Sequence, residues 1–141
     1  MTTESPQVII DANVLLSLLT DRNKKQRADG RELLRCAGRG EVTIVLPQFI
    51  LFETIYVLRS VYRYSASEII AALREAIALP GITLVDDCPW PEFFEHWSDL
   101  RPDIGDAAIL ALAVTKHYDT LATFDHKLVN RAKSLGISPY W

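Results

Sequence analysis

"VIIDANVLL", residues 8–16, is the stretch that decides the fold. Val8 to Ile10 have the apolar, β-branched character of a buried strand, and Val14 to Leu16 begin an apolar helix. Between them lie Asp11 and Asn13, where the chain passes from strand to helix. A buried carboxylate costs several kcal/mol unless it is paired or bound to a metal. We therefore expect Asp11 to have a specific partner.

Strands and helices alternate along the rest of the chain. Strands are also predicted at 42–46, 82–86 and 120–124, with a short edge strand in 137–141. Helices are predicted between them, one beginning at Pro47 and one opened by a capping box of Ser65 and Glu68. The alternation predicts right-handed crossovers and an α/β fold: a three-layer α/β/α sandwich with a central, mostly parallel sheet of about five strands. Ligands of such sheets bind beyond the carboxyl ends of the strands.

Size and composition favour a single domain over residues 1–141 of a cytoplasmic protein. Hydrophobic residues make up 49% and charged residues 23% of the chain, which is typical of globular proteins. Cys36 and Cys88 are isolated, as in proteins with reduced thiols. The first residues do not resemble a signal peptide, and no apolar run reaches the ~18 residues of a membrane span.

Charge is unevenly distributed. The net charge is −3, yet residues 22–39 contain seven Lys and Arg against Asp29 and Glu32. Such a segment is either a solvated helix face or a binding surface for a polyanion, and the first is the more common case. The residues proposed for nucleic-acid binding are Lys24, Lys25, Arg27 and Arg31.

Four carboxylates are expected to meet at one end of the sheet. Asp11 and Asp125 follow predicted strands, whereas Glu53 and Asp106 share helical stripes with apolar residues that face the core. Four carboxylates in one place raise one another's pKa values unless a cation balances them. Mg²⁺ or Mn²⁺ prefers oxygen ligands and can promote phosphodiester hydrolysis.

Helix capping is the simpler explanation for most of these acids. Asp11 and Asp125 are suited to cap the helices that follow them, and Asp103 and Asp106 suit a first helical turn. Glu53 lies in the middle of a helix and gains nothing from a helix end. No His or Cys spacing indicates zinc, and no glycine-rich phosphate loop is present in the sequence.

Four blocks of sequence resemble the PIN-domain family in their order: "VIIDANVLL", "VLPQFILFETIYVL", "DIGDAAILALA" and "LATFDHKL". The length of the chain is similar to that of VapC-type toxins of toxin–antitoxin pairs. The resemblance implies a Mg²⁺-dependent endoribonuclease, with Mn²⁺ as a substitute, that leaves 3′-hydroxyl and 5′-phosphate ends. It also implies an RNA substrate, a cognate antitoxin and a homodimer.

Roles follow from the resemblance position by position. Asp11 and Asp106 would bind the metal directly, and Glu53 and Asp125 would complete the catalytic acids. Asn13 would support Asp11, and Thr123 would support Asp125. Asp103 is an additional acid whose place in the family pattern varies.

Two other functions remain open from the sequence. A haloacid-dehalogenase-like phosphatase also begins from an Asp at a strand end, but its second Asp corresponds to Asn13 here. A non-catalytic PIN-like module for RNA binding or scaffolding is the other, and the retention of all four acids argues against it.

A partner helix is expected to bind a groove between two helices. Its apolar lining would combine side chains of the first and third predicted helices. These residues are Leu15, Leu18, Leu19, Phe49, Phe52 and Tyr56.

Overall fold

A five-stranded sheet forms the centre of the computed structural model, which describes residues 5–100 and 103–141. The strands are β1 (Gln7–Ile10), β2 (Thr43–Pro47), β3 (Ile82–Val85), β4 (Thr120–Ala122) and β5 (Ser138–Pro139). Their order is β3-β2-β1-β4-β5, and every neighbouring pair is parallel. The predicted α/β class is confirmed, and the sheet is entirely parallel.

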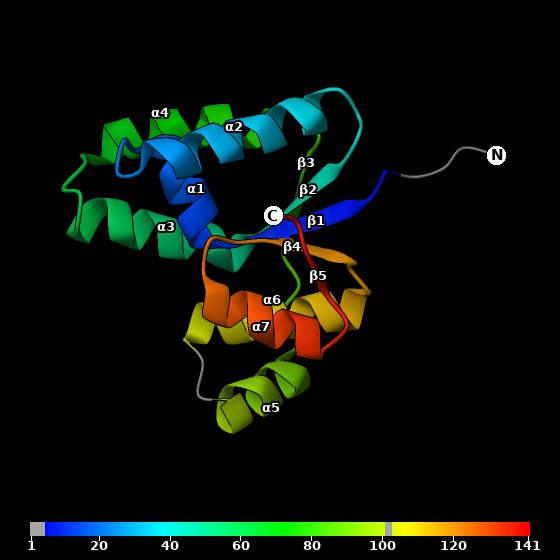
Figure 1. Cartoon of the computed structure of the whole chain (residues 1–141). Coiled ribbons are helices and arrows are strands. Elements are labelled where there is room, and N and C mark those ends of the chain that lie inside the picture. The colour runs from blue at the N-terminus through cyan, green and yellow to red at the C-terminus, as the bar shows by residue number, and fades with distance from the viewer. Residues whose placement is uncertain (1–4, 101–102) are drawn as a thin grey trace.

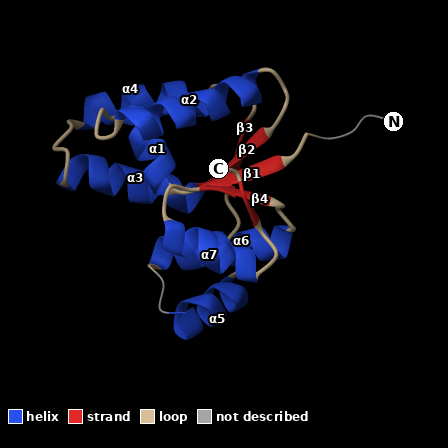
Figure 2. Ribbon diagram, in the orientation of Figure 1, coloured by secondary structure: helices blue, strands red, loops and turns tan. Residues whose placement is uncertain are grey.

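Helices cover both faces of this sheet (Figures 1 and 2). On one face lie α1 (Ala12–Leu19), α2 (Lys24–Gly38), α3 (Gln48–Ser60) and α4 (Ala66–Ile77). On the other lie α5 (Trp90–Leu100), α6 (Ile104–Lys116) and α7 (His126–Ser134). The three layers expected from the alternating pattern are therefore present. None of the helices in the described part of the chain is both long and apolar enough to cross a membrane.

Local sequence accounts for most helix boundaries. The Ser65 hydroxyl accepts a hydrogen bond from the Glu68 amide, and the Glu68 carboxylate accepts one from the Ser65 amide, which confirms the predicted capping box. Pro47 departs from its predicted position. It is the last residue of β2, pairs with Val85 of β3, and caps α3, which begins at Gln48. Its fixed φ suits the extended backbone of a strand end as well as a first helical turn.

The core lies where β1 passes between the two helical layers. Val8, Ile9 and Ile10 are all buried, as expected for a central parallel strand covered on both sides. Every residue of α6 from Ala107 to Ala113 is buried as well. Ala107, Ala108 and Ala111 of this run pack against Phe93 of α5, and the remaining side chains belong to the main core with β1.

The strand order fixes the place of the site. The chain builds outward from β1 through β2 to β3, then returns to the other side of β1 with β4 and β5. The point between β1 and β4 is thus a topological switch, where open α/β sheets bind their ligands. Asp11 directly follows β1, and Thr123 and Asp125 follow β4, so all three lie at this point.

Candidate active site

Asp11 is a buried carboxylate at the end of the central strand, with 4% of its surface exposed. Its Oδ1 accepts a hydrogen bond from the Val14 amide at 3.0 Å, which caps α1. Burial raises the pKa of Asp11, while the hydrogen bonds from Thr123 and Val14 oppose the rise. The sequence left two interpretations of Asp11 open, a cap of the following helix or a member of the acidic site. In the structure Asp11 caps the helix and also lies with the other acids.

Thr123 fixes the second oxygen of the same carboxylate. Its hydroxyl donates to Asp11 Oδ2 at 2.5 Å and accepts from the Asp125 amide at 3.1 Å. The hydrogen bond joins residues 112 positions apart in the chain and ties β4 to β1. We expected Thr123 to support the Asp125 carboxylate, but its side chain supports the Asp11 carboxylate instead. The reason is the register, which sets Ile10 beside Ala122 and so brings the two following residues together.

Glu53 reaches the site from α3. It lies against Gly105 of α6, where an added Cβ would be 2.7 Å from Glu53 Oε2. Burial, followed by the charges of Asp103, Asp106 and Asp11, raises the pKa of Glu53 to about 7. Glu53 therefore lies within electrostatic range of three other acids, as its position on an apolar helical stripe predicted.

Asp106 and Asp103 come from the start of α6. Burial, followed by the charges of Asp103, Asp11 and Asp125, raises the pKa of Asp106 to about 6. Asp103 caps α6, and its Oδ1 accepts from the Gly105 amide at 3.1 Å. The capping interpretation thus holds for Asp103, whose charge also raises the pKa values of Glu53 and Asp106.

Asp125 and Asn13 occupy the rim. Asp125 caps α7, accepting from the Lys127 amide at 2.9 Å, and its charge raises the pKa values of Asp11 and Asp106. Asn13 is exposed, and its Oδ1 accepts from Arg22 Nη1 at 3.5 Å. The expected support of Asp11 by Asn13 is not what the structure shows: Asp11 is held by Thr123 and Val14.

The oxygen-rich set at this edge suits a hard divalent cation. Burial and mutual repulsion raise three of its carboxyl pKa values, and a bound cation would relieve that repulsion. In the described part of the chain, no three His, Cys, Asp or Glu side chains form a group that could hold a metal ion by themselves. This donor set fits Mg²⁺, which binds through one or two carboxylates and keeps several waters.

Two arginines at the site are not among the individual residues that the sequence predicted there. Arg22 donates through Nε to Ser17 and through Nη2 to the Asn13 carbonyl, and its charge lowers the pKa of Asp11. The charge of Arg131, on α7, lowers the pKa of Asp106. Arg22 belongs to the basic segment that the sequence singled out, whereas nothing in the sequence around Arg131 indicates its place. Gly105 was likewise missed, although it lies in the "DIGDAAI" block.

The basic segment divides between two surfaces. Lys25 lines a hollow together with Thr123, next to the acids, and forms an ion pair with Asp29 at 3.1 Å. Arg31 lines a different hollow with Leu15 and Leu18. Lys24 is exposed, and Arg27 has a buried Nε without a hydrogen-bond partner among the described residues. Lys25 and Arg31 thus line different hollows.

The expected single groove between α1 and α3 is wrong. Leu15 is buried in the core, and the hollow that it lines with Leu18 and Leu19 is closed by α2 and α4. Phe49 and Phe52 line another hollow, formed with α5 and α6. Leu16 of α1 instead packs directly with Leu58 of α3 and Ile69 of α4, a contact that the sequence pattern does not reveal.

Comparison with known proteins gives consistent results. The sequence model of a family described as PIN domain matches residues 7–127. No curated protein matches the chain significantly in sequence. The chain is similar in structure to VapC20 of Mycobacterium tuberculosis, described as a sarcin–ricin loop cleaving toxin. The identity is 14% and the TM-score 0.63, over 88% of this chain and 94% of that one.

Two further solved structures share the fold. VapBC2 from Rickettsia felis, crystallised with a DNA fragment from its promoter, gives a TM-score of 0.67 at 14% identity, over 96% of this chain and 99% of that one. PAE2754 from Pyrobaculum aerophilum gives 0.64 at 18% identity, over 96% and 91%. At these identities the likeness shows the fold, while the sequence model covers most of the chain. The resemblance noted in the sequence is confirmed, and this chain belongs to the PIN domain family.

Proposed function

We propose that the chain is a divalent-metal-dependent endoribonuclease and the toxin component of a toxin–antitoxin pair. The observation that carries the proposal is the meeting of Glu53 and Asp106, from helices on opposite faces of the sheet, beside Asp11. The charge of Asp106 raises the pKa of Glu53, and the charge of Asp11 raises the pKa values of both. Carboxylates that repel one another do not stabilise a fold. Their meeting at a topological switch point therefore supports a functional site.

The proposed roles follow from the contacts. Asp11 and Asp106 would hold Mg²⁺ or Mn²⁺, which when bound would activate water and stabilise charge on the phosphodiester. Thr123 holds Asp11 Oδ2, and the Val14 amide holds Oδ1, so this carboxylate is oriented before any ligand arrives. Glu53, with a pKa of about 7, is able to take up or release a proton near neutral pH. Asp125 adds negative charge at the rim.

The two alternatives are now unequal. Membership of the PIN domain family argues against a haloacid-dehalogenase-like phosphatase, and so does Asn13, which is exposed and bonded to Arg22. A non-catalytic PIN-like module remains a competing proposal. It predicts RNA binding without cleavage, which the following experiment distinguishes.

Cleavage of RNA by the purified full chain tests the function. We expect single-stranded or structured RNA to be cut with MgCl₂ or MnCl₂ and left intact in chelator, with 3′-hydroxyl and 5′-phosphate ends. Asp106→Asn should abolish cleavage. Asp119→Asn is the matched control. Asp119 is exposed and directly precedes β4, so it lies at the amino-terminal ends of the strands, opposite the acids. Full activity in chelator, or equal activity of both variants, would contradict the proposal.

The proposed antitoxin partner and homodimer need separate tests. Large apolar side chains are exposed on α3, α5 and α6, among them Phe52 (65%), Trp90 (57%) and Ile104 (57%), which line one hollow. Such a surface is typical of protein interfaces. We expect the product of an adjacent small open reading frame to co-purify with the chain, and sedimentation to report a dimer. If no neighbouring product binds and the lone chain does not arrest growth, the toxin assignment fails although the nuclease can stand.

A further inference from the structure

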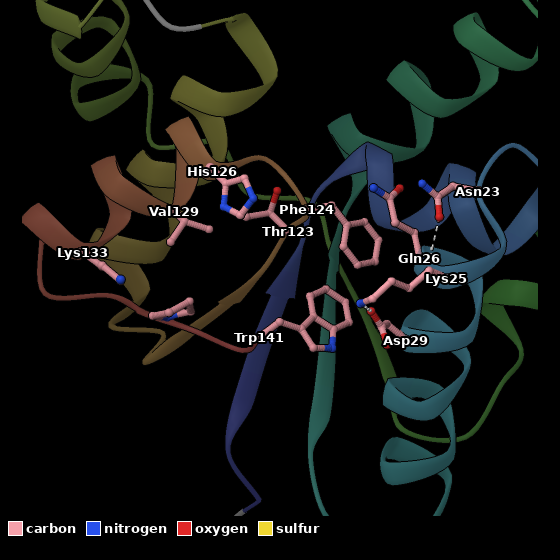
Figure 3. A pocket seen from close by; sticks show the side chains of 11 residues that line it. Asn23, Lys25, Gln26, Asp29, Thr123, Phe124, His126, Val129, Lys133 and Trp141 are labelled. Atoms are coloured by element: carbon pink, nitrogen blue, oxygen red, sulfur yellow. Dashed lines mark hydrogen bonds and ion pairs between the residues drawn. The ribbon is translucent and has the colours of Figure 1, made fainter.

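A hollow of about 450 Å³ adjoins the acidic site on the side of β5. Figure 3 shows it between α7, which carries His126 and Lys133, and α2, which carries Lys25. Thr123 lines the same hollow, and its hydroxyl contacts Asp11. A ligand in the hollow would therefore touch a residue that contacts the proposed metal ligand.

Two stacked aromatic rings form the centre of the hollow. Phe124, between Thr123 and Asp125, packs against Trp141 with the ring centroids 4.5 Å apart and an angle of 16° between the planes. Because β5 is parallel to β4, Trp141 lies at the same edge of the sheet as Asp11 and Asp125. Trp141 is 41% exposed as a whole residue and lines the hollow, where a ligand can meet it.

The charge around the rings is opposite to that of the acidic site. Lys25 and Lys133 line the hollow against one acid, Asp29, which pairs with Lys25. A polyanionic substrate is repelled by a cluster of carboxylates, and cations beside that cluster offset the repulsion. Aromatic faces next to lysines are the recurring means of binding single-stranded nucleic acid, whose bases stack while its phosphates meet the cations.

We propose that the hollow is a stacking subsite for single-stranded RNA: one unpaired base flanking the cut phosphodiester stacks on Trp141, and Lys133 and Lys25 meet its phosphates. The inference rests on the proposed function for its choice of ligand. It adds a preference for unpaired RNA at that position, since a base held in a helix cannot reach the indole. Thr123 then belongs to both sites, with its hydroxyl on Asp11 and its side chain in the wall of the hollow.

Binding under non-cleaving conditions tests the subsite. In the Asp106→Asn background, a short oligoribonucleotide carries the fluorescent base 2-aminopurine at successive positions. Stacking on the indole should quench it at one position. Trp141→Ala should remove the quenching and weaken binding about five-fold or more, the usual loss for one stacked base. Trp141→Phe should keep part of both effects.

Matched variants separate stacking from general effects. Trp97→Ala removes an exposed tryptophan of α5, a helix of which no described residue lines this hollow, and it should leave quenching and affinity unchanged. Lys133→Ala should weaken binding of every sequence and lower the salt slope by about 0.7, the value for one phosphate contact on a single strand. Double-stranded RNA should show no Trp141-dependent change.

Failure of the subsite is distinguishable from failure of the nuclease proposal. Suppose that the wild type cuts RNA, but adding Trp141→Ala to the Asp106→Asn background changes RNA affinity by less than two-fold and leaves the 2-aminopurine quenching equal. The subsite is then wrong and the nuclease proposal stands. If the wild type cuts nothing but the Trp141-dependent quenching is present, the subsite stands alone. A third outcome is that a poly-glutamate peptide displaces the RNA, that the affinity for this peptide depends on Trp141, and that no base is quenched. This outcome would assign the hollow to an acidic polypeptide and overturn the inference.

Discussion

Glu53 and Asp106 make the metal-free protein sensitive to pH near neutrality. Their pKa values are about 7 and about 6, above those of an unfolded chain. The native state therefore holds their protons more tightly than the unfolded state, so the free energy of unfolding should fall as pH rises from about 5 to about 8. One pKa unit is worth ~1.4 kcal/mol, and because both side chains are partly exposed, solvent screening lowers the expected loss to about 1–2 kcal/mol in total.

Urea unfolding in chelator across this pH range measures the effect. Glu53→Gln should be more stable than the wild type at the alkaline end, and the difference should vanish at the acidic end where Glu53 is protonated. A wild-type stability that rises with pH over this window would show that the carboxylates are stabilised rather than strained by their surroundings.

Thr123 provides a second prediction for a single residue. Thr123→Val keeps the shape of the side chain but removes the hydroxyl that donates to the buried Asp11 carboxylate. Loss of one partner of a buried hydrogen bond costs about 1–3 kcal/mol, more when a charge is involved. We expect that loss in chemical unfolding at alkaline pH, together with reduced RNA cleavage, whereas Thr123→Ser should restore both. Equal stability of the Val and Ser variants would mean that the hydrogen bond has no role.

The contact of α3 with α6 depends on a glycine. Gly105→Ala would put a Cβ 2.7 Å from Glu53 Oε2. The end of the Glu53 side chain can move away, so the fold should persist while the carboxylate shifts. A displacement of this kind costs about 10- to 100-fold in a catalytic rate. We expect the cleavage rate to fall by that amount with little change in melting temperature.

Gly38→Ala is the control for this variant. Gly38 is exposed at the end of α2, with nothing within 4 Å of an added Cβ. Its cleavage rate should equal that of the wild type. If Gly105→Ala also cleaves at the wild-type rate, Glu53 does not need its observed position.

At the scale of elements, the sequence predicted the features that depend on residues close together in the chain. Strand 8–10, the capping box at Ser65 and the inward-facing Glu53 follow from hydrophobic periodicity and short-range hydrogen bonds. Contacts between distant segments did not follow. The bond from Thr123 to Asp11, the stacking of Phe124 on Trp141 and the packing of Gly105 on Glu53 depend on register and helix approach, which a single sequence does not encode visibly.

At the scale of the whole molecule, the alternation of strands and helices predicted the layers, and the layers predicted where the acids meet. The sequence was less informative about surfaces. It assigned side chains of α1 and α3 to one groove, but Leu18 and Leu19 line a hollow with α2 and α4, whereas Phe49 and Phe52 line another with α5 and α6. A side chain on the outer face of one helix can be covered by another element in the folded chain or remain exposed. Binding surfaces therefore have to be assigned from the three-dimensional structure.

Metal binding should also release protons from the assembled site. Near pH 6.5 the carboxyls of Glu53 and Asp106 are partly protonated, given pKa values of about 7 and about 6. A bound cation favours their ionised forms, so part of the protons must leave on binding. Calorimetric titration with Mn²⁺ in two buffers of different ionisation enthalpy should give different apparent heats at this pH and similar heats near pH 8. Equal heats in both buffers at the lower pH would mean that these groups do not respond to the metal.

The most direct test of the account is the affinity for Mn²⁺, measured by the same titration at alkaline pH on the wild type, Asp11→Asn, Asp106→Asn and the control Asp119→Asn. If the acids at the switch point form the metal site, the wild type and Asp119→Asn should bind equally. The Asp11 and Asp106 variants should lose about ten-fold or more in affinity while remaining folded. Two results would contradict the proposal that these acids bind the catalytic metal. One is wild-type affinity for Mn²⁺ in Asp11→Asn and Asp106→Asn, and the other is RNA cleavage by a wild type that binds no metal.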